Sequence, residues 1–166
     1  MLAITFVVYL FALFHFTGAG TLHDALRFGV DFNPHQANLL PLLGFFGDVE
    51  GHLLNILLFV PLGILVPMLS GRSLGVLHMI LMASVTSGII EASQLLNSRV
   101  TDIDDLLMNV FGALMGYWLF CRIKPRGSEH SCKKHGISLS VAMIAAFFGR
   151  FFLYDEMGLA KMLFGF

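Results

Sequence analysis

Polar side chains interrupt three otherwise apolar stretches of this chain, and their spacing suggests a single site. Glu91 and Gln94 lie three positions apart and would share one face of a helix, while Asp105 and Asn109 would share a face of another. If these stretches cross a membrane, a charge near the centre costs on the order of 2.5–3.5 kcal/mol. With the nearest cation in the sequence included, the candidate ligand-binding residues are Asn55, Glu91, Gln94, Arg99, Asp102, Asp105 and Asn109.

The chemistry of these side chains leaves three functions open. Amide and guanidinium donors beside carboxylate acceptors suit the polar head group of a lipid or of a lipid-linked envelope precursor. Alternatively, Glu91, Asp102 and Asp105 could be the acid and base, or the Mg²⁺ or Ca²⁺ ligands, of an intramembrane enzyme acting on an envelope lipid or glycolipid. Thirdly, the cluster could serve merely to fix helix packing, and the protein would then be a structural or regulatory partner of another membrane protein. We favour head-group binding, because packing alone rarely needs several ionisable groups and because an enzyme would lack an identifiable nucleophile.

Other chemistry finds little support in the sequence. No Ser-His-Asp arrangement, phosphate-binding glycine loop or HExxH helix is present. His52 is the histidine nearest the cluster, and a histidine that precedes a span is expected to be solvated. We therefore expect no cofactor, and a metal ion only if the protein is an enzyme.

The composition is that of a membrane protein. Hydrophobic residues make up 57% of the 166 residues, charged residues only 13%, and the mean hydropathy is +0.80. So little charge cannot cover the surface of a water-soluble chain of this length. The formal net charge of −1 provides no basic field for nucleic acid, so we expect none as a partner.

The expected fold is all-α, a polytopic transmembrane helical bundle, since a span needs about 20 apolar residues. Four spans and a fifth candidate are predicted, namely Leu2–Phe16 with its exit to Gly20, His52–Leu69, Leu74–Leu96, Ile103–Ile123 and Ile137–Tyr154. The chain then divides into an N-terminal anchor (1–20), an exterior loop with an interfacial segment (21–51), a three-helix core (52–123), a basic cytoplasmic loop (124–136), and a fifth helix with a tail (137–166).

Basic residues indicate the orientation, because cytoplasmic loops retain Lys and Arg. A cytoplasmic N-terminus places six cations inside, namely Arg72, Arg122, Lys124, Arg126, Lys133 and Lys134. Most carboxylates are then outside. The fifth segment could instead lie along the membrane surface, and both termini would then be cytoplasmic.

This arrangement places the polar side chains of three spans at a common depth, roughly 6–9 Å below the outer surface. The short connection between the third and fourth spans makes them adjacent and antiparallel. Gly112 and Gly116 form a small-xxx-small pair that allows a neighbouring helix to approach closely. Pro61 interrupts the second span and is expected to kink it.

Three stretches of these spans, which together hold four short motifs, resemble the VanZ-like membrane protein family. The stretches are Asn55–Gly63 (NILLFVPLG), Glu91–Gln94 (EASQ) and Arg99–Gly116 (RVTDIDDLLMNVFGALMG), so the resemblance covers about residues 50–120. Within these motifs we expect structural roles for Pro61, Gly63, Gly112 and Gly116. The resemblance implies an integral protein of the bacterial cell envelope, in the inner membrane, with a link to glycopeptide (teicoplanin) resistance. The family supplies no reaction that could be carried over, and the oligomeric state stays open.

Overall fold

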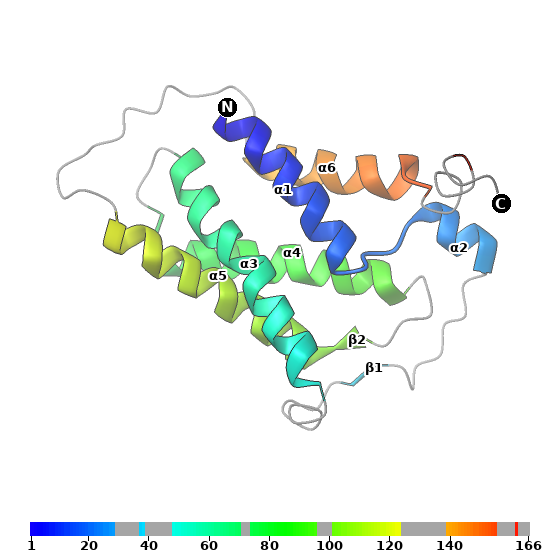
Figure 1. Ribbon diagram of the computed structural model, residues 1–166, viewed down its shortest axis with the longest axis horizontal. Coiled ribbons are helices and arrows are strands. Elements are labelled where there is room, and N and C mark those ends of the chain that lie inside the picture. The colour runs from blue at the N-terminus through cyan, green and yellow to red at the C-terminus, as the bar shows by residue number, and fades with distance from the viewer. Residues whose placement is uncertain are drawn as a thin grey trace.

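The computed structural model describes residues 1–28, 37–38, 48–70, 74–95, 101–123, 139–155 and 162. These residues form six helices and one pair of two-residue strands (Figure 1). The elements are α1 (Leu2–Phe16), α2 (Leu22–Phe28), β1 (Ala37–Asn38), α3 (Val49–Ser70), α4 (Val76–Leu95), β2 (Thr101–Asp102), α5 (Ile103–Ile123) and α6 (Leu139–Leu153). The expected all-helical, membrane-type fold is confirmed.

Among the described residues, three helices are long and apolar enough to cross a membrane: α3, α4 and α5. Helices α1 and α6 have 15 residues each and would extend roughly 22 Å, less than the hydrocarbon core of about 30 Å. The four spans and candidate fifth of the sequence interpretation are therefore confirmed only for the central three.

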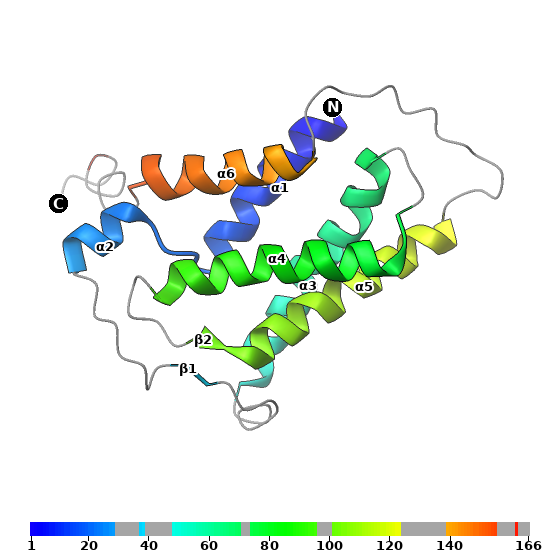
Figure 2. The same ribbon diagram turned by 180° about the vertical axis from the view of Figure 1, so that it is seen from behind.

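The helix ends share one side of the bundle. Figures 1 and 2 show that the C-terminal ends of α1, α4 and α6 lie on the same side as the N-terminal ends of α3 and α5. We call this side, which also carries α2, the α2 end. Helices α4 and α5 are neighbours and run antiparallel, as their short connection predicts.

Helix α3 packs most closely against α5, and glycines make this approach possible. A Cβ atom at Gly112 would overlap the carbonyl oxygen of Ile56, and one at Gly116 would overlap that of Val60. On α3, a Cβ at Gly63 would overlap the backbone of Ala113. The two helices thus meet backbone to backbone, as small residues permit in membrane helix pairs.

The N-termini of two helices are set by capping side chains. Asp48 accepts a hydrogen bond at 3.0 Å from the Gly51 amide, so α3 begins at Val49, before the expected start at His52. Thr21 and Asp24 bond reciprocally, with Asp24 N donating to Thr21 Oγ1 at 3.2 Å, and this capping box begins α2. Helix α2 lies within the expected exterior loop.

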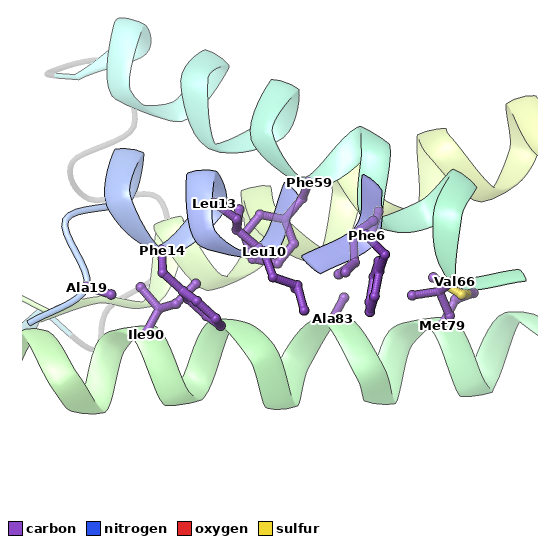
Figure 3. Close-up of a cluster of buried hydrophobic side chains, with 12 residues drawn as sticks. Phe6, Leu10, Leu13, Phe14, Ala19, Phe59, Val66, Met79, Ala83 and Ile90 are labelled. Carbon is purple, nitrogen blue, oxygen red and sulfur yellow. The ribbon is translucent and has the colours of Figure 1, made fainter. Parts of the chain in front are cut away.

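Helix α1 covers the groove between α3 and α4. Figure 3 shows Phe6, Leu10 and Leu13 of α1 among buried side chains of these two helices. The Tyr9 hydroxyl donates to the Leu58 carbonyl of α3 at 2.8 Å. The preceding carbonyl, that of Leu57, receives no helical hydrogen bond because Pro61 has no N–H. Helix α3 runs continuously through both of its prolines.

Helix α6, which lies near the C-terminal end of the sequence, packs on α1. Buried Arg150 donates to the Ala19 carbonyl oxygen and lies 5.4 Å from the Tyr154 ring centre. The Phe14 and Phe147 rings meet edge to face at 5.4 Å. These contacts make α6 part of the bundle.

Parallel strands join the expected exterior loop to the α4–α5 connection. Ala37 pairs with Thr101, and Asn38 pairs with Asp102. Three predicted features lie outside the described residues: the apolar run 39–46, which is the interfacial segment of the exterior loop, Arg99, and the basic loop 124–136.

Candidate functional site

Helices α3 and α5 carry one group of polar side chains at the α2 end. Asn55 of α3 hydrogen-bonds the Asp105 carboxylate of α5, and His52, Asp48 and Asp102 lie close enough to interact with it electrostatically. Two of the predicted site residues on different helices are therefore brought together, with a third nearby. The expectation of a solvated His52 is wrong, because this side chain is buried between the helices.

A second group lies between α4 and α5. Asn109 of α5 donates through Nδ2 to Ser87 Oγ of α4 at 2.9 Å. Asn109 is 2% exposed, and its Oδ1 has no hydrogen-bond partner among the described residues. Glu91, one turn beyond Ser87 on α4, is 7% exposed. Both Glu91 and Asn109 are thus buried polar residues on helices that can span a membrane.

Gln94 reaches α1. Its Nε2 donates to the Thr17 carbonyl oxygen at 2.7 Å, which ties the C-terminal ends of α1 and α4 together. Its Oε1 is buried and accepts no hydrogen bond within the described part of the chain. Next to it, Ser93 Oγ accepts from the Gly20 amide at 3.1 Å.

Asp102 has a local structural role, because its Oδ1 accepts from the Asp104 amide at 2.9 Å where α5 begins. Asp104 itself is completely buried, and the sequence reasoning missed it. An acid at this position is typical of a first helical turn, but that preference does not indicate burial, and the site residues were chosen by their spacing from Asn109. Ser87 was missed too, because a lone serine in an apolar helix resembles a packing residue.

A metal centre finds no support in the described ranges, where no three His, Cys, Asp or Glu side chains are grouped to hold an ion. The arrangement instead offers hydrogen-bond acceptors. Asn109 Oδ1 and Gln94 Oε1 are buried amide oxygens. Asp105 and Glu91 supply carboxylates in the part of the bundle toward the α2 end. Such a set suits a ligand that donates hydrogen bonds, such as one with hydroxyl or ammonium groups.

A family model described as VanZ/LLP1 matches residues 2–124, which include α1 to α5 and all predicted site residues. Helix α6 lies beyond the matched region. No curated protein and no solved structure matches the chain.

Proposed function

Because this chain belongs to the VanZ/LLP1 family, we propose that it is a multi-pass protein of the bacterial inner membrane that binds a polar head group. The ligand is a lipid or a lipid-linked envelope precursor. It binds at the α2 end, which faces the outside when the N-terminus is cytoplasmic. Binding alters the envelope and so contributes to glycopeptide (teicoplanin) resistance.

One observation carries this proposal: the side-chain oxygen of Asn109, Oδ1, is buried in a helix that can span the membrane and has no hydrogen-bond partner among the described residues. An unsatisfied buried acceptor costs about 1–3 kcal/mol, and hydrocarbon offers no donor to relieve it. A hydroxyl or ammonium group of a bound lipid would provide that donor. Asn55, Gln94 and Asp105 extend the site toward the α2 end, and Arg99 adds a cation for a phosphate.

The test compares two carboxylates of the α2 end. Glu91 is buried, whereas Glu50 is exposed in the first turn of α3. The full chain, wild type or carrying Glu91→Gln or Glu50→Gln, is placed in nanodiscs. The probes are phosphatidylethanolamine, phosphatidylglycerol and an undecaprenyl-linked cell-wall precursor, and native mass spectrometry measures their retention.

We expect Glu91→Gln to weaken retention of one probe by about 10- to 100-fold, the cost of losing a hydrogen bond to a charged group. Thermal unfolding should stay near that of the wild type, and Glu50→Gln should behave like the wild type in both measurements. The same variants should differ in teicoplanin sensitivity when expressed at equal abundance.

Other outcomes point elsewhere. Full retention by Glu91→Gln, with unchanged drug sensitivity, would mean that the cluster only packs helices. Chemical turnover of a probe would make the protein an enzyme, with Glu91, Asp102 and Asp105 as its candidate groups. Arg99→Gln tests for an anionic ligand, and Arg99→Lys should be intermediate because it keeps the charge but loses the bidentate geometry.

A further inference from the structure

A pocket lies on the side of α4 away from Asn109, between α4 and α6. It has a volume of about 80 Å³, and Phe14 of α1 forms part of its wall. The rest of the lining comes from α4 (Met82, Val85, Thr86 and Ile89) and from α6 (Met143, Ile144 and Phe147).

The walls of this pocket are apolar. Thr86 is the one hydroxyl residue of the lining, and its Oγ1 already donates to the Met82 carbonyl at 2.7 Å. The wall therefore offers no free donor, and a water molecule would lack the 2–4 polar partners it normally needs. The occupant that fits is a hydrocarbon.

The pocket also marks incomplete packing. Helix α6 packs against α1, but its backbone does not approach α4 closely. Figure 2 shows α6 and α4 as neighbours with α1 beside them. Val85 on α4 and Ile144 on α6 are exposed, so the pocket opens to the outside between these helices. Met82 and Met143 are flexible side chains that adapt to irregular occupants.

The position of the pocket along α4 indicates where the hydrocarbon comes from. The α4 side of the pocket, Met82 to Ile89, occupies the middle of a helix that can span the membrane. At that depth the surrounding medium is made of acyl chains. We propose that the pocket holds a short stretch of one acyl chain of a membrane phospholipid, which fills the space between α4 and α6, while the rest of the chain stays in the bilayer. This site is independent of the head-group cluster, since it lies on another face of α4.

The experiment uses the full chain in phosphatidylethanolamine–phosphatidylglycerol vesicles. One phospholipid carries a diazirine halfway along an acyl chain, and light-induced adducts are mapped by peptide mass spectrometry. Val85→Trp blocks the α4 rim of the pocket. Leu81→Trp is its matched control, because Leu81 is a similarly exposed residue one turn earlier that does not line the pocket.

We expect adducts to concentrate on Met82, Met143 and Ile144. Val85→Trp should lower this labelling by about fivefold, which corresponds to roughly 1 kcal/mol, and Leu81→Trp should leave it unchanged. If Val85→Trp does not fold, Ile144→Trp blocks the α6 rim, with exposed Val141→Trp as its control. Labelling spread evenly over the exposed apolar residues, or insensitive to the rim variants, would mean annular lipid only and would overturn the proposal.

Discussion

Asn109 joins two helices and keeps one buried oxygen unpartnered within the described structure. Its hydrogen bond to Ser87 contributes about 1 kcal/mol, whereas the unsatisfied oxygen costs about 1–3 kcal/mol. For stability alone, an apolar pair at these two positions would be at least as good. This balance favours the proposed binding role for the amide over a role in folding.

The first prediction follows from this balance. In the double variant Ser87→Ala/Asn109→Leu both partners of the bond become apolar, so no polar atom of the pair stays buried. Thermal unfolding in detergent should occur at or above the wild-type temperature, while retention of the lipid probe is lost. Single Asn109→Leu leaves the Ser87 Oγ without this donor and should be less stable than the double variant. A double variant that unfolds early would show that the bond serves the fold.

Sequence spacing alone indicates part of this site. Glu91 and Asn109 stand out because a polar group in an apolar run is costly, and Asn55 and Asp105 do meet. The direction of Gln94 toward α1 could not be predicted, since it depends on where α1 ends. Nor could the burial of Asp104, because helical spacing does not fix how a helix is rotated about its axis.

The α3–α5 pair forms the centre of the bundle, and the expected role of its glycines agrees with their positions. Hydropathy locates all the long helices, but it misplaces the start of α3, because the cap at Asp48 adds a polar turn. Helix α2 escapes hydropathy altogether, since seven residues held by a capping box show no apolar periodicity. The local hydrogen bonds that set these ends are visible only as short polar patterns in the sequence.

The second prediction compares glycines of two helices. Gly116→Ala would place a methyl group against the Val60 carbonyl and force α3 and α5 apart, at a cost of about 1–3 kcal/mol. Gly88→Ala on α4 has nothing within 4 Å of the new methyl group, so the higher helix propensity of alanine should leave stability equal or slightly higher. Chemical unfolding in mixed micelles measures both. Equal losses of stability in the two variants would contradict the backbone contact.

At the scale of the whole molecule, the charges predict an orientation. Arg122 of α5 lies over the Trp118 ring at 4.7 Å, at the bundle end opposite α2. Arginine and tryptophan together are typical of a membrane interface, and the cytoplasmic one is rich in cations. The sequence predicts this sidedness, while the short lengths of α1 and α6 leave only the central three helices defined as spans.

The third prediction tests the orientation. Single cysteines replace Ser98 or Ser128 in a chain whose native Cys121 and Cys132 are changed to serine. An impermeant maleimide should label position 98 in intact cells, and position 128 only after permeabilisation. A reversed pattern would place the α2 end inside the cell, and the proposed ligand would then have to be cytoplasmic.

The bond from Arg150 to Ala19 has a consequence for how the protein is made. Its two residues are separated by 131 positions, so α1 leaves the ribosome long before its partner on α6 exists. During that interval the Ala19 carbonyl and the Phe14 ring lack their partners on α6. The contacts between α1 and α6 therefore form only after α6 has been made, and a chain that ends before α6 leaves this surface of α1 uncovered.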